Sequence, residues 1–335
     1  MRDIFKIAGI YTAIILGAGF ASGQEIATFF VRYGQKGFFG ILLSGIIFSF
    51  VGYIVLEIAY IKKINSSTEF MQLLFGKASG TAQIINQIFL FILYFTMLSA
   101  SGATLKQEFD MPYIFGIIIM ALLCIISYSM GTNFIAKINF AISPILFIGT
   151  IFVGLYAIIK HESMPVFFVQ NQNWIKSALL YPAYNIITGV CVLVPIINTL
   201  RNKKYGKYGA VLGGIFMSIL GLIIALAIFL NYEIIKQTQI PMLAIANKFS
   251  NSIKYIYLIV FMLAVFSTAI GNFFGLCENL EQKKIPHPKI FVSILAIIFA
   301  NIEFSRLISK IYPAFGYIGL FEIIFIATFY IFMQK

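Results

Sequence analysis

Long apolar runs, bounded by charged or turn-forming residues, dominate the pattern along the 335-residue chain. A membrane-spanning helix needs about 20 mostly apolar residues, and ten runs fit that description. They cover residues 7–31, 37–60, 83–106, 112–130, 134–158, 174–199, 206–231, 254–277, 289–305 and 312–332. Two connections, 64–80 and 240–251, look helical without spanning. The pattern therefore predicts an all-α polytopic membrane protein with ten transmembrane helices and no room for a soluble domain.

Composition and charge agree with this prediction. Apolar residues make up 60% of the chain and charged residues only 11%, whereas soluble chains carry about 25% charge. The 24 basic residues lie singly or in short clusters, which excludes a nucleic-acid surface and instead indicates topology. With the N-terminus inside, 14 of them face the cytoplasm, including the clusters 201–207 and 283–289. We expect a multi-pass protein of the plasma membrane with both termini cytoplasmic.

The first apolar run is interrupted by the sequence GAGFASGQE at residues 17–25. A glycine in a helix costs about 1 kcal/mol relative to alanine, and a carboxylate at bilayer depth costs several. Such a stretch favours an unwound segment that faces a cavity. The sixth run carries a weaker counterpart, YPAYNIITG at 181–189, about half a chain away. The alternative is that the glycines only permit close helix packing, but packing requires neither Gln24 nor Glu25.

The two interruptions divide the ten runs into two sets of five, residues 1–165 and 166–335. An odd-numbered repeat must reverse its orientation on the second pass, so the halves are expected to be inverted repeats that together form one membrane domain. Helices 1 and 6 would be discontinuous in this 5+5 arrangement. Half-helix ends near the membrane midplane present free N–H groups to anions and free carbonyls to cations. The sequence therefore places a binding site at the two interruptions.

The run GAGFASGQE, between an apolar half-helix and an apolar-aromatic stretch, resembles the YkvI-type family of proposed amino-acid permeases. That family belongs to the amino acid–polyamine–organocation superfamily, whose members have a 5+5 inverted-repeat fold of the leucine-transporter type. The resemblance implies alternating access around a site between helices 1, 3, 6 and 8. The expected substrate-binding residues are Ala18, Gly19, Phe20, Ala21, Gly23, Gln24, Glu25, Tyr94, Tyr184, Asn185, Thr188 and Gly189. Phe20, Tyr94 and Tyr184, with Thr96, either form an aromatic lid over the site or are ordinary packing residues.

Four acidic residues at membrane depth need an explanation. Glu57 and Glu303 lie within a turn or so of basic residues, so both are expected to pair or to snorkel. Glu322, near the middle of the last run, has no cation close in sequence and is either a packing carboxyl or a proton site. Glu25 follows the first interruption directly. It can exchange a proton or pair with a substrate ammonium, or it can cap the N–H groups of the second half-helix.

Two hydroxyl residues in the eighth run suggest a cation. Placed on the leucine-transporter pattern, Gly19, Ser22 and Ala264 would supply carbonyl oxygens to one Na+, and Ser267 and Thr268 would supply hydroxyls. Ligation by oxygen alone suits a hard cation. The alternative is that both hydroxyls bond back to the preceding helical turn, as is common in membrane helices.

These observations favour a secondary active transporter that moves a small amino-acid-like or amine solute by alternating access, as a symporter coupled to Na+ or H+. The alternative is a transporter-like receptor or sensor subunit that binds such a solute without net transport. An enzyme is not expected, because HExxH, GxSxG and paired carboxylates are missing from the sequence, and the absence of a Walker-type loop argues against ATP coupling. The expected partners are the solute and membrane lipid, and no cofactor is expected apart from a bound Na+.

Overall fold

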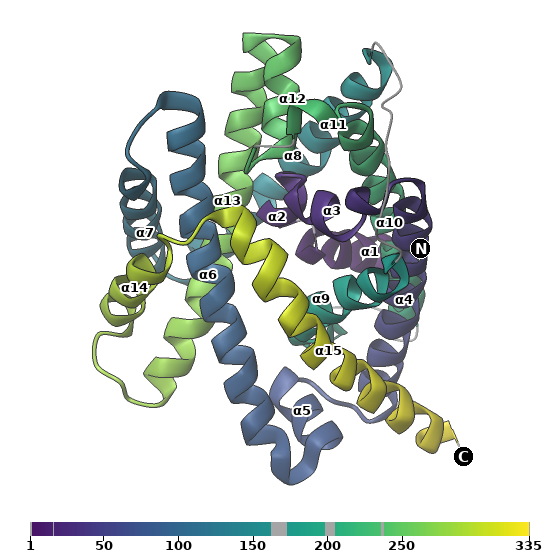
Figure 1. Ribbon diagram of the computed structural model, residues 1–335. Coiled ribbons are helices and arrows are strands. Elements are labelled where there is room, and N and C mark those ends of the chain that lie inside the picture. The colour runs from purple at the N-terminus through teal and green to yellow at the C-terminus, as the bar shows by residue number, and fades with distance from the viewer. Residues whose placement is uncertain (1, 16, 162–172, 198–204, 236–237, 335) are drawn as a thin grey trace.

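The computed structural model describes residues 2–15, 17–161, 173–197, 205–235 and 238–334, which are almost entirely helical (Figure 1). The helices are α1 (Arg2–Ile15), α2 (Ala18–Ala21), α3 (Gln24–Phe29), the 3-10 helix η1 (Val31–Tyr33), α4 (Gln35–Ile61), α5 (Ser67–Phe75), the 3-10 helix η2 (Gly76–Ala78), α6 (Ser79–Phe109), α7 (Tyr113–Ser129), α8 (Thr132–Ile159), α9 (Trp174–Ile196), α10 (Gly206–Leu230), α11 (Tyr232–Ile235), α12 (Pro241–Phe249), α13 (Asn251–Gln282), α14 (Pro288–Phe299) and α15 (Phe304–Gln334). The expected boundary between repeats at 165–166, residues 198–199 of the sixth run and the basic residues at 201–204 lie outside the described ranges.

Seven segments of the described chain are long and apolar enough to cross a membrane. They are α4, α8, α9, α10, α13, α15 and the stretch Ser67–Phe109 that contains α6. Shorter apolar helices at Ile4–Ala13, Tyr113–Ser129 and Pro288–Phe299 coincide with the first, fourth and ninth predicted runs. The two short helices expected outside the spans are present as α5 and α12. The chain is thus an all-helical, multi-pass membrane protein, while the count of ten spans stays a prediction.

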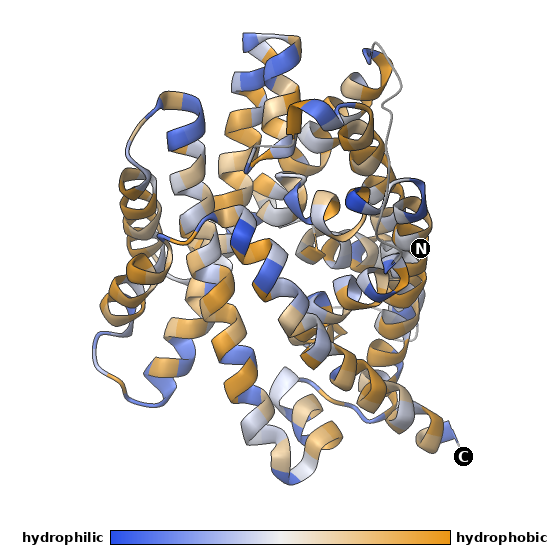
Figure 2. Cartoon of the chain, in the orientation of Figure 1, coloured by the Kyte–Doolittle hydropathy of each residue, from blue (hydrophilic) through white to orange (hydrophobic). Residues whose placement is uncertain are grey.

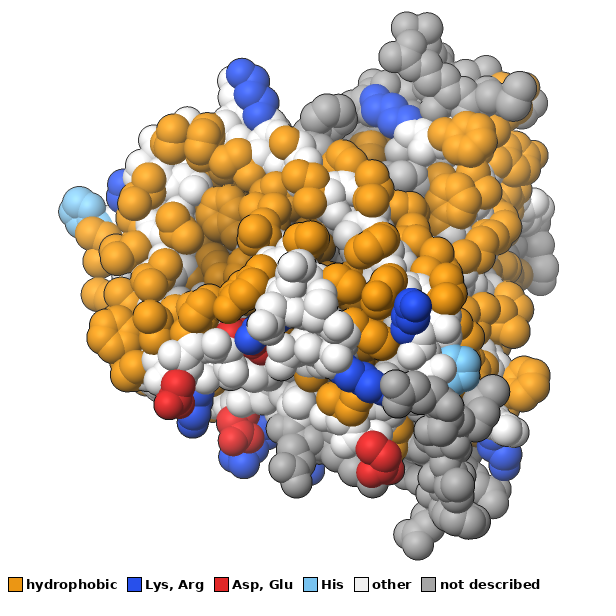
Figure 3. Space-filling view, turned by 90° about the horizontal axis from the view of Figure 1, so that it is seen from above, with side chains coloured by type: hydrophobic (Ala, Val, Ile, Leu, Met, Phe, Trp, Pro, Cys, Tyr) orange, Lys and Arg blue, Asp and Glu red, His pale blue; other side chains and the backbone are white. Residues whose placement is uncertain are grey.

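The outer surface of the bundle is suited to lipid. Figure 2 shows apolar residues along most of each long helix, with hydrophilic residues gathered at helix ends and connections. Large apolar side chains such as Ile46, Ile148 and Phe332 are exposed on these helices. On the face drawn in Figure 3, hydrophobic side chains cover most of the upper part of the view, and acidic side chains lie next to Lys or Arg in its lower part. Such an apolar surface is stable in contact with acyl chains rather than water.

Two sets of closely packed helices can be distinguished, and α8 and α15 pack on members of both. In one set, α4 packs on α9 and α10, and α1 packs on α10. In the other, α6, α7, α13 and α14 pack on one another. An ion pair lies within each set: Glu57 of α4 with Lys207 of α10 at 2.7 Å, and Glu108 of α6 with Lys254 of α13 at 2.8 Å. The short helices α2 and α3 lie between the sets, since α2 contacts α13 and α3 contacts α10 (Figure 1).

The predicted interruption of the sixth span is wrong, because α9 is one continuous helix across residues 181–189. Pro182 lacks the N–H that would bond to the carbonyl of Ala178 one turn earlier. The hydroxyl of Ser44, on α4, donates to that carbonyl instead at 2.8 Å. A side chain from a neighbouring helix thus satisfies the backbone group that proline leaves free, and the helix continues.

Candidate functional site

The first span is broken, as the sequence predicted. Helix α1 ends at Ile15, α2 is a single turn from Ala18, and α3 starts at Gln24. Gly23 separates the two short helices with φ +78°, a left-handed conformation that favours glycine. A Cβ there would also lie 2.8 Å from the side chains of Ile228 and Met242. Both the conformation and the packing at this position therefore require glycine.

Other helices satisfy the backbone groups that the break exposes. The hydroxyl of Tyr257, on α13, donates to the carbonyl of Ala21 at 2.5 Å, and the Met242 N–H, on α12, donates to the carbonyl of Ser22 at 2.9 Å. The Ala18 N–H donates to the hydroxyl of Thr268 at 3.2 Å. Unpaired backbone groups are costly away from water, so these contacts hold the break in one conformation.

Glu25 lies in the first turn of α3 and is only 6% exposed. Its carboxylate packs against the backbone of Gly19, in the space that a side chain at that position would occupy. The hydroxyls of Tyr184 and Tyr181, on α9, lie near enough to interact with this carboxylate. However, Glu25 Oε2 and both hydroxyls lack a hydrogen-bond partner of good geometry among the described residues. Three buried polar atoms thus lie close together with hydrogen-bonding capacity that the described residues do not fully use.

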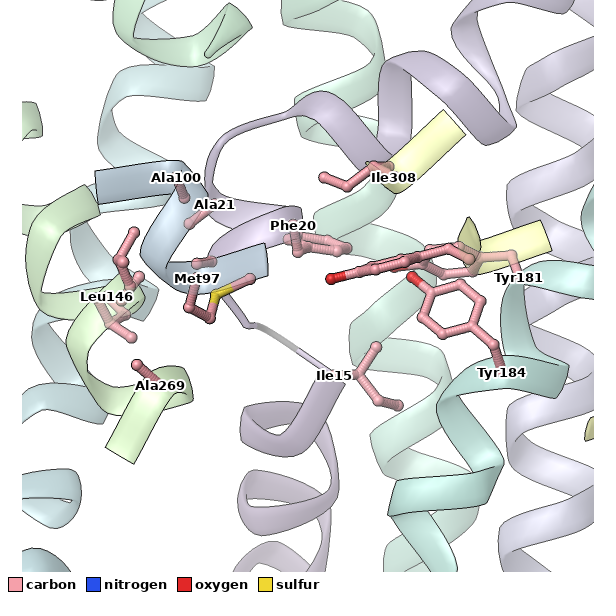
Figure 4. Close-up of a cluster of buried hydrophobic side chains, with 14 of the residues drawn as sticks. Ile15, Phe20, Ala21, Met97, Ala100, Leu146, Tyr181, Tyr184, Ala269 and Ile308 are labelled. Carbon is pink, nitrogen blue, oxygen red and sulfur yellow. The ribbon is translucent and has the colours of Figure 1, made fainter. Parts of the chain in front are cut away.

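Aromatic rings enclose the carboxylate. The ring centroid of Phe29, on α3, lies 5.4 Å from that of Tyr181 and 5.5 Å from that of Tyr184. Tyr312, on α15, is 5.1 Å from Tyr184. Figure 4 shows Phe20 on α2 between Met97 of α6 and the two tyrosines of α9. The break thus faces a water-poor, aromatic surface on the side of α9.

Several other predicted substrate-binding residues do not contact the Glu25 carboxylate. Most of their polar groups form hydrogen bonds within their own segments. Tyr94 packs on Phe273 of α13, with ring centroids 4.9 Å apart. The Asn185 amide donates to the Tyr181 carbonyl at 2.9 Å, and the Thr188 hydroxyl donates to the Asn185 carbonyl at 3.2 Å. Both groups are thus occupied within α9, and they stay only predicted substrate ligands. Gly189 lies in the same continuous helix, and Gln24 begins α3 with its N–H bonded to Ser22 Oγ at 3.0 Å.

The predicted sodium ligands are only partly assembled. Thr268 lies against the break through Ala18, and the Ser22 hydroxyl donates to the Gly19 carbonyl at 2.7 Å. Ser267 instead donates to Asn139 Oδ1, on α8, at 3.0 Å. An ion bound by all five predicted groups, including the carbonyl of Ala264, would require the Ser267 hydroxyl to leave Asn139. The sodium site therefore stays a prediction.

A polar cleft of about 200 Å³ lies beyond the aromatic rings, between η1, the start of α9 and α15. Phe29 and Leu180 line it together with Arg32 and Lys176. Arg32 donates to the Tyr33 hydroxyl at 2.6 Å, and the Lys176 ammonium lies 5.1 Å from the ring centroid of Tyr317. None of the described residues that line the cleft is acidic. The cleft is therefore electropositive, and Phe29 separates it from Tyr181 and Tyr184.

Glu57 and Glu303 were expected to pair with nearby basic residues or to snorkel, and both lie close to a basic residue. Glu57 is paired, but with Lys207 rather than with its sequence neighbours. Glu303 and Arg306 lie 3.6 Å apart and are both exposed. Sequence reasoning missed Tyr181, Tyr257 and Tyr312 as parts of the site, because each is a single tyrosine in a chain with 18 of them. A proline directly follows both Tyr181 and Tyr312, and it is the local signal that the sequence offered.

The fold is that of known membrane transporters. The chain superposes on a manganese transporter of Eremococcus coleocola with a TM-score of 0.64 and 13% identity, covering 97% of this chain and 78% of that one. It superposes on Mhp1, a nucleobase-cation-symport-1 family transporter, with a TM-score of 0.61 and 15% identity, covering 91% of this chain and 74% of Mhp1. For a Na+-coupled sialic acid symporter the TM-score is 0.57 and the sequence identity 14%, and the superposition covers 93% of this chain and 75% of the symporter. These neighbours are LeuT-fold secondary transporters rather than enzymes.

No family model matches the chain, but curated relatives do. The chain is 34% identical over 330 residues to the uncharacterized membrane protein YkvI of Bacillus subtilis, covering 94% of this chain and 92% of that protein. It is 26% identical over 323 residues to the uncharacterized protein YyaD of the same organism, with 92% of each covered. The chain belongs to the YkvI family of membrane proteins.

Proposed function

We propose that this protein is a secondary active transporter that carries a small amino-acid-like or amine solute across the plasma membrane by alternating access. The observation that carries the proposal is the Glu25 carboxylate, which is buried beside the unpartnered hydroxyls of Tyr181 and Tyr184 at a helix break. A carboxylate with two hydroxyls, buried among aromatic rings, provides the acceptors that an ammonium group needs. A bound amine would satisfy all three polar atoms at once.

The electropositive cleft supports the amino-acid-like class. With the N-terminus cytoplasmic, the end of α3 and the start of α9 face outward, so a solute arriving from outside meets Arg32 and Lys176 first. These cations attract a carboxylate, whereas Glu25 attracts an ammonium. A zwitterion fits this order of charges better than a simple amine does.

The arrangement of the two helix sets supports alternating access around the break. The Glu57–Lys207 and Glu108–Lys254 ion pairs each lie within one set, so one set can rock against the other without breaking either pair. In a 5+5 inverted repeat, each ion pair would also join two equivalent helices. Glu57–Lys207 would join the second span (α4) to the seventh (α10), and Glu108–Lys254 the third span (α6) to the eighth (α13). Superposing α4 on α10 and α6 on α13 in one rotation of about 180° around an in-plane axis tests that repeat.

The experiment has two stages. A thermal-shift screen of the purified protein against amino acids and related amines, with and without Na+, identifies a solute. Uptake and counterflow of that solute in liposomes across a pH gradient then compare the parent, Glu25→Gln and the exposed control Glu303→Gln. Loss of a charge that pairs with ammonium should weaken binding by several kcal/mol, whereas loss of a proton site should leave counterflow intact and abolish pH-driven accumulation.

Other outcomes count against the proposal in distinct ways. Parent-like uptake and counterflow in Glu25→Gln would show that this carboxylate only caps α3, which is worth about 1 kcal/mol of stability. A solute that binds tightly to the parent without being moved in either assay would favour the receptor or sensor function instead.

A further inference from the structure

A second buried carboxyl lies well away from Glu25. Glu322, on α15, is only 7% exposed, and its Oε1 atom has no hydrogen-bond partner among the described residues. It takes part in no ion pair shown by the described residues. A buried ionised carboxylate without a cation is strongly disfavoured, so the groups around Glu322 decide its chemistry.

Three other helices bring polar side chains to this point. The amide of Asn86, on α6, donates to the thiol sulfur of Cys191, on α9, at 3.1 Å, and its Oδ1 atom has no partner. Cys191 also interacts with Glu322 and with Ser67, at the start of α5. The helices α5, α9 and α15 pack on one another, and α6 packs on all three. Glu322 and Asn86 therefore each bring one buried oxygen without a hydrogen-bond partner among the described residues to the helices that pack around this thiol.

Binding of one proton to Glu322 would provide a hydrogen-bond donor for these two acceptor oxygens. A neutral carboxyl carries one O–H donor in addition to its acceptors, whereas a carboxylate only accepts. Protonation of Glu322 removes the uncompensated charge and supplies the donor that the cluster lacks. A metal ion fits less well, because the described residues contain no group of three His, Cys, Asp or Glu side chains, and hard cations require several oxygen ligands.

We propose that Glu322, Asn86 and Cys191 form a proton-binding site in the cytoplasmic half of the bundle, separate from the site around Glu25. Along α9, Cys191 is seven residues beyond Tyr184, about 10 Å, and along α15, Glu322 is ten residues beyond Tyr312, about 15 Å. The rings of Phe89 and Phe315 stack at 4.5 Å and lie between the two levels. The two carboxyls thus occupy different levels along the same helices.

The cytoplasmic placement follows from α5, which belongs to the predicted inner connection and covers this site. Ser67 at its start reaches Cys191, and Phe75 at its end packs on Phe325 of α15 with ring centroids 5.1 Å apart. Farther along α15, Tyr330 lies near Glu57 and Lys207, which pair with each other and leave Glu322 without a cation. α5 thus lies between the site and the predicted cytoplasmic side, and we expect a proton bound here to exchange with the inner solution past α5.

The test uses the full chain in lipid nanodiscs without any solute, and infrared difference spectra recorded between acid and alkaline pH. The parent should show the C=O stretch of a protonated carboxyl. Glu322→Gln should lose that band and Glu25→Gln should keep it, so the result does not depend on the transport proposal. Asn86→Leu should shift its frequency, because it removes the amide oxygen that the proposal assigns as acceptor of the carboxyl proton, whereas the neighbouring control Gln87→Leu should not.

Three results would overturn the proposal. The first is a band that Glu322→Gln leaves unchanged. The second is a band that Na+ removes from the parent at constant pH, which would make this a sodium site. The third applies if Glu322→Gln does not fold, so that its spectrum cannot be recorded. If the carboxyl C=O stretch then has the same frequency in folded Asn86→Leu as in the parent, the Asn86 amide does not contact the carboxyl.

Discussion

The carboxylate of Glu25 fills the space where a side chain at Gly19 would stand. A Cβ placed on Gly19 would overlap the nearer carboxylate oxygen and lie 2.6 Å from the carboxyl carbon. The two residues are six positions apart, and the turn at Gly23 folds α3 back so that they meet. The glycine therefore admits a charged group to the backbone of the broken helix.

Gly19→Ala should displace the Glu25 carboxylate and lower the stability of the protein by about 1–3 kcal/mol, the usual cost of overpacking. The stabilisation that a bound solute gives in thermal unfolding should fall with it, because the carboxylate no longer faces Tyr181 and Tyr184. Gly271→Ala is the matched control, since a Cβ there meets no atom within 4 Å. Equal effects of the two substitutions would show that the Gly19 contact is unimportant.

The continuity of α9 gives a second prediction, which concerns Ser44 and Pro182. Ser44→Ala should cost about 1–3 kcal/mol, because it leaves the buried Ala178 carbonyl without its donor. Pro182→Ala should reduce that cost by restoring the helical N–H. A double-mutant cycle, read by thermal unfolding in detergent, measures the coupling. Additive effects would mean that the serine does not substitute for the missing N–H.

These residues also show how far the sequence could lead. The first break was predictable, because glycines and a carboxylate at membrane depth fit no lipid-facing helix. The local pattern also predicted a second, weaker break around Pro182. It failed there because the compensating hydroxyl of Ser44 comes from 134 positions earlier, and no local rule reveals such a partner. Hydropathy thus predicted the positions of the helices, while tertiary contacts decided their continuity.

Some residues of the candidate site could likewise be predicted from their local sequence, and others could not. Glu25 and its neighbours in the first break were identified from their own segment. Asn185 carried the same polar signal, but its amide bonds to its own helix one turn earlier, which any helix offers to an asparagine. Tyr257 and Tyr312 reach the site from α13 and α15, so their roles depend on packing that the sequence does not display.

The sodium hypothesis makes a third prediction. If Gly19, Ser22, Ala264, Ser267 and Thr268 bind Na+, their oxygens should converge to roughly 2.3–2.6 Å from one point in an ion-bound structure. Solute binding should then depend on Na+, and Ser267→Ala combined with Thr268→Val should remove that dependence. Asn139→Ala serves as the control, because it removes the present partner of Ser267 without touching the predicted ligands. Sodium-independent binding in the parent would point to protons, and to Glu25 and Glu322.

The electropositive cleft supplies the last prediction, on the class of solute. Arg32 and Lys176 are exposed, so each should contribute less than about 1 kcal/mol to attracting a carboxylate. Replacing both with Gln should raise the KM for an amino acid by about fivefold, equivalent to about 1 kcal/mol, while kcat stays unchanged because the cleft lies outside the aromatic rings. High salt should reduce the difference between parent and variant, since salt screens exposed charges.

The corresponding amino-acid amide, which lacks the carboxylate, should be transported equally well by the parent and the double variant. Lys160→Gln is the matched control, because Lys160 is exposed but does not line the cleft. Equal losses for the amino acid and its amide would show that the two cations stabilise the outer ends of α3 and α9 rather than select a carboxylate. The solute would then be recognised through its amine alone, and Glu25 would be its single charged partner.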